Sequence, residues 1–294
     1  MPETFNTRKQ VAVIGGTAGI GRAIALHLAE LGANVLVVGR TFRDADHRSI
    51  RFIHADLSLM REARRVGGFL SAEPLDLIVM TTGIMPPPQR QETAEGLEME
   101  LAVSYLCRHV ILHSLAPRLG ANRTPGQRRP YVFVMGFPGS GQMAVLGDLN
   151  SEQSYQPMRT HMSTVAGNEM LVLDAARRYP QAAFFGLNPG IIRTEIRDNF
   201  LGKGSWKSRV IESLIGLVTP SPEDYAARIA PLLFDPQIDD LSGSMFNRKG
   251  KLIPASRALT PQYTERFMAE AGRLVDKALQ DEATDPGASR CPTP

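Results

Sequence analysis

The chain has 294 residues, of which 43% are hydrophobic and 21% charged, and its formal net charge is +3. That much apolar sequence can enclose one substantial core, so we expect a single α/β domain over residues 1–280 and a disordered tail over residues 281–294. The small excess of positive charge is dispersed and lacks interleaved aromatic residues, so nucleic acid is not an expected partner. No apolar run approaches the roughly 18 residues of a membrane span, and Cys107 and Cys291 lie far apart, so we expect a cytoplasmic protein without disulfides.

A glycine-rich turn follows the first predicted element. The apolar run 10–14 is typical of a buried parallel strand, and apolar residues at helical spacing predict a helix from about residue 20 onward. The glycines between them would let the backbone turn sharply and approach a pyrophosphate, which the free N–H groups at the start of a helix favour. This order of strand, glycines and helix predicts a dinucleotide site formed by Gly15, Thr17, Gly19, Ile20 and Gly21.

The second predicted strand, residues 34–40, ends in Arg40, with Arg43 close behind. An acidic residue at this place would bind the ribose hydroxyls of NAD, whereas a guanidinium suits the additional 2′-phosphate of NADP. The alternative is that Arg40 is only a solvated loop charge. The sequence therefore favours NADP(H) as the cofactor.

Further strand-like runs occur at residues 50–56, 75–82, 131–136, 182–188 and 243–247, mostly separated by helical patterns. This alternation predicts a single-domain Rossmann fold with a doubly wound parallel sheet of about seven strands. Residues 41–49 are too few for a full crossover helix, so we expect that helix to be truncated or missing. Long helices are predicted at residues 92–119 and 158–178, and the second of them is apolar on two faces.

Several of these segments resemble the short-chain dehydrogenase/reductase family, over residues 10 to about 255. Asp56-Leu57 resembles the adenine-contacting pair of the family, and Met80-Thr-Thr-Gly83 stands where the family has Asn-Asn-Ala-Gly. Residues 189–194 are similar to the family segment Pro-Gly-x-Val-x-Thr, whose last residues bind the nicotinamide carboxamide. The resemblance implies a cofactor groove that includes Asp56, Leu57, Gly83, Ile192 and Thr194.

Residues 147–161 resemble the retinol-dehydrogenase-like branch of this family, in which they lead into the catalytic Tyr-x-x-x-Lys. In that register the tyrosine position holds His161 and the lysine position holds Val165. The serine position holds Phe137 or Gly136, and the supporting asparagine position holds Ser104. The chain is identified as an atypical member that lacks all four catalytic residues of the family.

His161 is the candidate proton-transfer residue. Valine cannot lower the pKa of a neighbouring phenol or hold a ribose, which are the two tasks of the family's lysine. An imidazole needs no such help, because the unperturbed pKa of histidine is roughly 6.5. The alternative for His161 is a hydrogen-bonded structural residue on an apolar helix.

Two nearby residues could add a hydroxyl to the catalytic site. Ser140 could replace the missing serine, and Tyr155 could supply a phenol. Pro157 argues against a helical Tyr155-x-x-x-Arg159 pair, so a pocket wall is the alternative for Tyr155. His109 and His113 lie one helical turn apart, but no third ligand is evident, so no metal site is expected.

The sequence says less about the substrate and the reaction than about the fold and the cofactor. Residues 194–220, which close over the substrate in the family, are rich in apolar side chains and favour a small apolar substrate, although a helix covering the sheet would show the same pattern. We expect an NADP(H)-dependent oxidoreductase that acts on a carbonyl or activated double bond. The alternatives are a redox-silent enzyme of specialised metabolism, such as a cyclase, isomerase or dehydratase, and a non-catalytic NADP(H)-binding protein. The family resemblance implies a homodimer or homotetramer formed through the two long helices.

Overall fold

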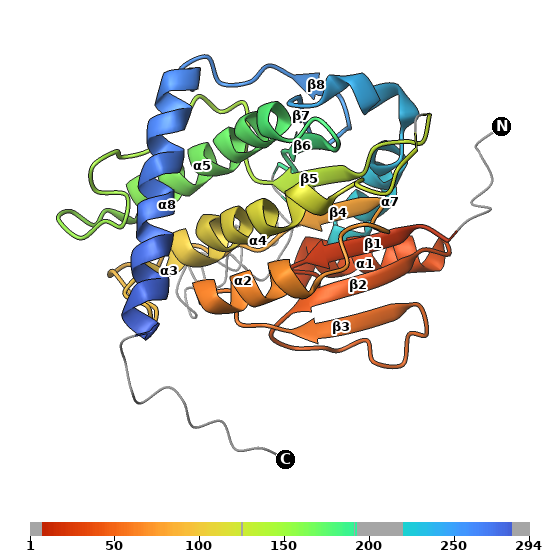
Figure 1. Cartoon of the computed structure of the whole chain (residues 1–294), viewed down its shortest axis with the longest axis horizontal. Helices are drawn as coiled ribbons and strands as arrows, with labels where there is room; N and C mark the ends of the chain where they lie inside the picture. Colours follow the sequence, from red (N-terminus) through yellow and green to blue (C-terminus); the bar gives the residue numbers. More distant parts are fainter. Residues whose placement is uncertain (1–7, 125, 191, 193–219, 284–294) are drawn as a thin grey trace, which may run out of the picture.

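A mostly parallel sheet forms the centre of the molecule (Figure 1). The structure is a computed structural model that describes residues 8–124, 126–190, 192 and 220–283. Its eight strands follow the order β3-β2-β1-β4-β5-β6-β7-β8. They are β1 (Gln10–Ile14), β2 (Asn34–Gly39), β3 (Ile50–His54), β4 (Leu77–Met80), β5 (Tyr131–Met135), β6 (Ala183–Leu187), β7 (Met245–Phe246) and β8 (Leu252–Ile253). The doubly wound Rossmann sheet predicted from the sequence is confirmed.

The carboxyl ends of seven strands share one edge of this sheet. β1 to β7 pair in parallel, and only β8 is antiparallel, to β7. In an open α/β sheet, ligands bind outside the carboxyl ends of the strands. The turn after β1, the segment after β4 and the start of the helix that follows β5 all lie at this edge.

Helices cover both faces of the sheet (Figure 1). α1 (Gly19–Glu30) and α7 (Pro222–Leu233) pack on one face, and α2 (Met60–Phe69), α4 (Cys107–Leu115) and α5 (Pro157–Arg178) pack on the other. α8 (Pro261–Ala283) lies outside α2 and α5. α3 (Met99–Leu101), a π-helical segment (Ala102–Leu106) and α4 form one nearly continuous helix, and short 3-10 turns occupy Ala116–Arg118 and Pro236–Leu241.

The helix predicted over residues 92–119 begins later than expected. Glu92 and Glu98 form an isolated antiparallel bridge, and the side chain of Glu98 caps α3 by accepting a hydrogen bond from the Leu101 nitrogen at 2.6 Å. The helix predicted over residues 158–178 is confirmed as α5. No helix forms at residues 41–49, as predicted.

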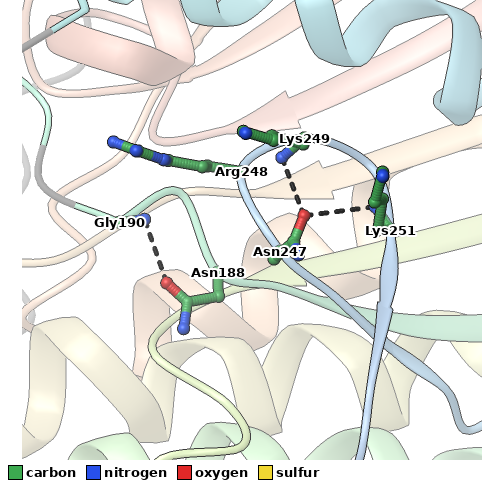
Figure 2. A pocket seen from close by; sticks show the side chains of 6 residues that line it. All are labelled: Asn188, Gly190, Asn247, Arg248, Lys249 and Lys251. Atoms are coloured by element: carbon green, nitrogen blue, oxygen red, sulfur yellow. Dashed lines mark hydrogen bonds between the residues drawn. The ribbon is translucent and has the colours of Figure 1, made fainter.

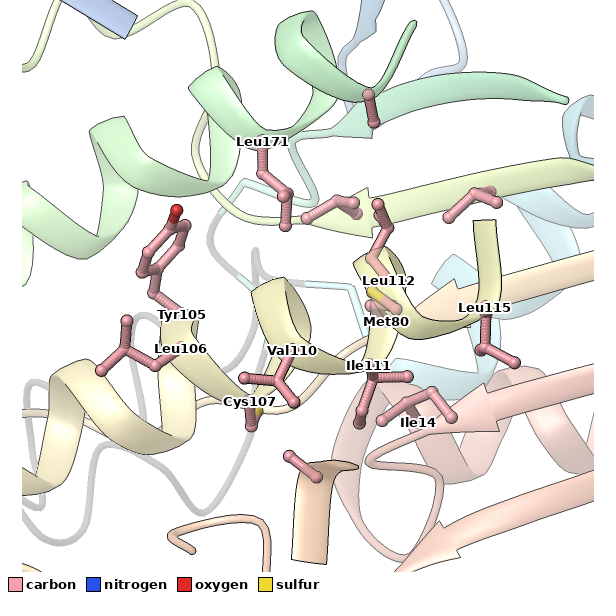
Figure 3. Packing of buried hydrophobic residues seen from close by; sticks show 14 of the residues in the cluster. Ile14, Met80, Tyr105, Leu106, Cys107, Val110, Ile111, Leu112, Leu115 and Leu171 are labelled. Atoms are coloured by element: carbon pink, nitrogen blue, oxygen red, sulfur yellow. The ribbon is translucent and has the colours of Figure 1, made fainter. Parts of the chain in front are cut away.

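Apolar side chains between α4 and the sheet form a large part of the core (Figure 3). Ile111, Leu112 and Leu115 of α4 are nearly inaccessible to solvent, as are Ile14 of β1 and Met80 of β4. Each such side chain contributes about 1.5–3 kcal/mol by leaving water. This packing fixes the position of the long helix relative to the ends of β1 and β4.

The second apolar face of α5 is covered by α8 of the same chain. A Cβ atom at Gly167 would lie 2.7 Å from the Phe267 ring and 2.9 Å from the Tyr105 ring, so only glycine fits between them. The Tyr105 hydroxyl also donates a hydrogen bond to the sulfur of Met268 at 3.3 Å. The two-faced pattern of α5 is thus explained within one chain.

Two details differ from the predictions. β8 adds an eighth strand to the predicted seven, and its two residues are too few to show an alternating pattern. α8 continues to Ala283, past the predicted tail boundary at residue 281, while residues 284–294 lie outside the described residues.

Candidate active site and cofactor groove

The glycine turn after β1 has the predicted geometry. Gly15 and Gly19 have positive φ angles of +91° and +52°, which side-chain-bearing residues rarely adopt. A Cβ atom on Gly15 would lie 2.6 Å from the Thr82 nitrogen, and one on Gly21 would lie 2.5 Å from the Gly15 carbonyl oxygen. The absence of side chains at these positions lets β1, the start of α1 and the end of β4 approach one another closely.

The start of α1 is free to bind an anion. Among the described residues, no side chain caps α1 at Ala18, and its first turn contains no acidic residue. The first N–H groups of a helix lack partners within the helix and favour negative charge. Thr17 and Ile20 are partly exposed at this turn. These residues fit the pyrophosphate of a dinucleotide.

Arg40 and Arg43 are exposed after β2, and within the described ranges neither forms a hydrogen bond or an ion pair. Asp44, the nearest acidic residue in this loop, pairs instead with Arg22 of α1. The Arg22 Nε lies 2.9 Å from one carboxylate oxygen of Asp44, and Nη2 lies 2.5 Å from the other. Because Asp44 is paired with Arg22, it does not neutralise the guanidinium groups of Arg40 and Arg43.

The other predicted groove residues are placed as follows. Asp56 accepts hydrogen bonds from the Ser58 nitrogen at 3.1 Å and hydroxyl at 2.8 Å through Oδ1 alone, and Leu57 is buried beside it. Gly83 follows β4 at the edge of the sheet. Ile192 packs its side chain into the core with α1 and α7, so that side chain does not line the groove. Thr194 lies outside the described residues.

His161 lies one turn into α5, at the edge of the sheet where β1 to β7 end. Its Nδ1 atom is 2.5 Å from Oε1 of Glu100, a carboxylate that is fully buried on α3. The His161 side chain is 23% exposed. Glu100 therefore occupies Nδ1, and Nε2 is the ring nitrogen left for a substrate.

The Glu100 carboxylate is held in a dry environment. Burial raises its pKa, and the hydrogen bond from His161 opposes that increase. The Thr164 hydroxyl lies 3.4 Å from the same oxygen, Oε1. A carboxylate that accepts the Nδ1 proton of a histidine fixes its tautomer and orientation and stabilises the imidazolium form. The pair can therefore hold a proton on Nε2 or receive one there.

The helix that carries Glu100 becomes π-helical over Ala102–Leu106, around Ser104. Such segments often occur at functional sites because they change the direction of the side chains. The Ser104 hydroxyl accepts a hydrogen bond from the Ile84 nitrogen at 3.1 Å, and its carbonyl oxygen accepts one from Asn168 of α5 at 2.9 Å. Ser104 therefore ties the segment after β4 to the two long helices.

Arg108 is a buried cation below this site. Its guanidinium donates to the Thr82 hydroxyl at 3.0 Å, to the Asn168 side-chain oxygen at 2.9 Å, and to the carbonyl oxygens of Thr82 and Met135. No carboxylate pairs with it in the described part of the chain. Burial lowers its pKa to about 10, so it stays protonated at neutral pH. A fixed positive charge thus lies beneath the ends of β4 and β5.

Ser140 is not brought to His161. Its neighbours Gly139 and Gly141 donate backbone hydrogen bonds to Glu169 at 3.0 Å and to Ser256 at 3.0 Å. Glu169 lies eight residues after His161 on α5, a rise of about 12 Å along the helix. The Ser140 hydroxyl is buried without a partner among the described residues. At the family's serine position, Phe137 is 45% exposed.

Tyr155 precedes α5 and is not part of a helical pair with Arg159, in agreement with the argument from Pro157. Its hydroxyl donates a hydrogen bond to the Pro87 carbonyl oxygen at 2.6 Å. Burial raises its pKa to about 12, with further increases from Glu98 and Glu100. Tyr155 stays protonated near neutral pH and serves as a wall between two loops.

The two histidines of α4 are structural. The His109 ring lies 3.4 Å from the Tyr105 hydroxyl, and His113 lies 3.0 Å from the Tyr179 hydroxyl. Burial, with a contribution from His113, lowers the pKa of His109 to about 3. Among the residues that the structure describes, no group of three His, Cys, Asp or Glu side chains is placed to hold a metal ion.

Glu100 and Arg108 are site residues that the sequence analysis missed. Together with Ser104 they recur every four residues, which places all three on one face of a helix. That spacing could have identified them, because polar residues at regular intervals on an otherwise apolar helix must have partners when buried. The partners themselves, His161 and Asn168, lie on another helix.

Comparisons with known proteins agree with this geometry. Residues 9–112 match the family model described as short chain dehydrogenase. Uncharacterized oxidoreductase YKL107W of Saccharomyces cerevisiae is 47% identical over 281 residues, which cover 94% of this chain and 91% of that protein. Retinol dehydrogenase 13 of Homo sapiens is 23% identical over 284 residues, which cover 91% of this chain and 84% of that protein. The predicted resemblance to retinol dehydrogenases thus has a counterpart among the relatives.

The fold also has counterparts among solved structures. The Pseudomonas aeruginosa RhlG/NADP active-site complex superposes with a TM-score of 0.62 at 22% identity, covering 85% of this chain and 98% of that chain. At this identity the likeness concerns the fold alone. In the described part of this chain, no helix has the length and apolar character to cross a membrane.

Proposed function

The chain belongs to the short-chain dehydrogenase family of oxidoreductases, and on that premise we propose that it is an NADP(H)-dependent enzyme with His161 as its proton-transfer residue. Its substrate is a small apolar molecule with a carbonyl group or activated double bond, or the corresponding alcohol. The observation that carries the proposal is the hydrogen bond between His161 Nδ1 and Glu100. It gives the histidine a fixed orientation and a buried negative partner at the edge of the sheet where the glycine turn lies.

His161 and Glu100 act as a unit in this proposal. The chemistry of a bound nicotinamide is hydride transfer to or from carbon. During reduction, His161 Nε2 donates the proton to the substrate oxygen, and during oxidation it accepts that proton. Glu100 stabilises the imidazolium form, as the acidic member of a catalytic triad does.

Arg108 supplies part of the electrostatics that the family assigns to lysine. Its guanidinium lies beneath the ends of β4 and β5 and is held by four acceptors. A buried charge without a counter-ion favours electron-rich groups placed above it, because the local dielectric is low. The guanidinium of Arg108 is already engaged by Thr82, Met135 and Asn168, so its role is that of a positioning residue.

The preference for NADP(H) rests on Arg40 and Arg43. Both guanidinium groups are exposed where β2 ends, and the carboxylate of Asp44 is engaged by Arg22. A guanidinium binds a phosphate dianion through two parallel hydrogen bonds. These side chains can therefore hold the 2′-phosphate that distinguishes NADP from NAD.

An apolar substrate is supported by the surface around the site. Among the described residues, Phe137, Met143 and Met158 are large hydrophobic side chains that remain 41–47% exposed, and all three follow β5 or begin α5. Apolar side chains at the mouth of a pocket favour an apolar ligand. Retinol, the alcohol in the name of one relative, is such a molecule.

The homodimer or homotetramer implied by the family resemblance stays a prediction, and the packing of α8 bears on which surface would form it. α8 covers the outer face of α5 through Phe267 and Met268. We propose that α4 and α5 are not a contact between subunits in this protein. A molar mass measured by light scattering tests this: a monomer supports the proposal, and a dimer in which α4 or α5 of the two subunits can be cross-linked to each other would contradict it.

Deuterium transfer tests the proposed reaction. NADPH labelled with deuterium on the transferable face of C4 is incubated with an apolar aldehyde such as decanal, and the product is analysed by mass spectrometry. We expect deuterium in the alcohol product. An unlabelled, rearranged product would identify a redox-silent enzyme, and bound NADPH without any product would identify a binding protein.

A further inference from the structure

A positively charged pocket lies at the same edge of the sheet, beyond β6 (Figure 2). Its volume is about 450 Å³, and it is lined by Asn188, Gly190, Asn247, Arg248, Lys249 and Lys251. The turn between β7 and β8 contributes all three cations. Figure 2 shows Arg248 extending from this turn across Gly190. A Cβ atom at Gly190 would lie 3.2 Å from the Arg248 Cδ atom, so the glycine leaves room for the arginine stem.

The pocket walls are held by two asparagine side chains. Asn247 Oδ1 accepts hydrogen bonds from the backbone nitrogens of Lys249 at 2.9 Å and Lys251 at 3.2 Å. Asn188 accepts one from Gly190 at 2.9 Å and donates one to the Pro138 carbonyl oxygen at 3.2 Å. The turn that carries the cations is thus organised by Asn247, and the Asn188 nitrogen connects the segment after β6 to it by donating to the Phe246 carbonyl oxygen at 2.8 Å.

The three cations are not neutralised by the described part of the chain. Arg248, Lys249 and Lys251 are exposed, and no carboxylate of the described residues forms an ion pair with them. Like charges concentrated on a five-residue turn repel one another and focus a positive potential into the hollow that they line. An anion removes that repulsion, so the pocket favours a negatively charged ligand.

This pocket is distinct from the proposed 2′-phosphate site. Arg40 follows β2 and Arg248 follows β7, and five inter-strand steps separate these strands in the sheet. At about 4.8 Å per step, the two strands lie about 24 Å apart within the sheet. Gly190 belongs to the segment that the family resemblance places beside the nicotinamide. The charges therefore lie on the substrate side of the proposed coenzyme.

We infer that this pocket binds an anionic oxygen group, a carboxylate or a phosphate, carried by the substrate. The inference rests on the proposed function and narrows its substrate class to molecules with an apolar body and an acidic end. The exposed apolar side chains after β5 and at the start of α5 contact the body, and the turn after β7 contacts the acidic end. Charge-assisted hydrogen bonds from guanidinium and ammonium groups provide the recognition.

A matched pair of aldehydes tests the inference. Decanal and 10-oxodecanoate share the same chain and differ by one terminal carboxylate. We expect wild-type protein to prefer 10-oxodecanoate in kcat/KM, and we expect Lys249→Gln/Lys251→Gln to reduce this preference roughly tenfold. The variant Arg273→Gln/Lys277→Gln, which removes two exposed positive charges from α8, should retain the preference. An equal ratio of kcat/KM in all three proteins would overturn the inference.

A binding measurement separates this inference from the proposed function. Inorganic phosphate is titrated into the protein while the amide resonances of Gly190 and Lys251 are followed by NMR. Saturable shifts that disappear in Lys249→Gln/Lys251→Gln support the pocket even if neither aldehyde is turned over. The inference would be overturned if phosphate caused no shifts in wild-type protein. It would also be overturned if the double variant lost affinity for NADPH, because the cations would then bind the coenzyme.

Discussion

Replacing Glu100 with glutamine tests whether the negative charge of Glu100 stabilises the imidazolium form of His161. Glutamine keeps the shape of the side chain and can still accept a hydrogen bond from Nδ1, but it carries no charge. A hydrogen bond to a charged group contributes about 1.5–3 kcal/mol and a neutral one about 0.5–1.5 kcal/mol, so the substitution removes about 1–2 kcal/mol of stabilisation from the imidazolium form. Since 1.36 kcal/mol corresponds to a tenfold change in rate, we expect kcat to fall about 5- to 30-fold.

The assay follows NADPH oxidation at saturating NADPH with an apolar aldehyde. In Glu100→Gln, the imidazolium loses the buried anionic neighbour that lies 2.5 Å from Nδ1 in wild-type protein, so proton transfer from His161 should be slower. The dissociation constant for NADPH should stay within about twofold, because the Glu100 carboxylate contacts His161 and Thr164 of α5 rather than the glycine turn.

Tyr155→Phe is the matched control for this variant. It removes a buried hydroxyl from the same wall of the site, but that hydroxyl is bonded to the Pro87 carbonyl oxygen. We expect its kcat to change by less than about threefold. Equal losses in Tyr155→Phe and Glu100→Gln, or an unchanged rate in Glu100→Gln, would refute the role of the Glu100–His161 pair.

Three further predictions concern the cofactor, pH and packing. Arg40→Asp should weaken NADPH binding at least about tenfold and NADH binding by much less; equal weakening in fluorescence titrations would remove the argument for the 2′-phosphate. His109 is buried with its pKa lowered to about 3, so only the unfolded chain binds its proton between about pH 6.5 and pH 3, and the free energy of unfolding should fall by about 1.4 kcal/mol for each pH unit lowered across that range. The free energy of unfolding measured with urea should depend less steeply on pH in His109→Phe than in wild-type protein. Glu98 and Glu100 have pKa values raised by burial, so their contribution to this pH dependence has the opposite sign. Phe267→Ala should lower the free energy of unfolding by about 3–5 kcal/mol by opening a cavity against Gly167, with the exposed Phe69→Ala as a control near zero.

Most of the sheet could be predicted from the sequence because its central strands, β1, β4, β5 and β6, are nearly continuous apolar runs. β3 carries polar residues and β7 has only two residues, and both were recognised within longer strand-like segments. The short connection between β2 and β3 indicated the missing helix. The signal is local, since a strand buried on both faces needs apolar residues at every position. β8 has two residues and no such signal.

The site could be predicted only in part, because its central contacts join distant segments. His161 was identified from its position in a family motif, but its partner Glu100 lies 61 residues earlier. Arg108 meets acceptors from β4, β5 and α5, and none of these pairings follows from local spacing. Likewise, the two-faced pattern of α5 showed that a second partner exists but not that α8 provides it.

The central claim is that His161 donates the proton in a reaction that uses bound NADPH. Single-turnover oxidation of NADPH by decanal, measured by stopped-flow for wild-type protein and His161→Phe, tests it most directly. The account predicts a rate about 10²–10⁴-fold lower in His161→Phe with NADPH binding retained. An equal single-turnover rate in the two proteins would contradict it.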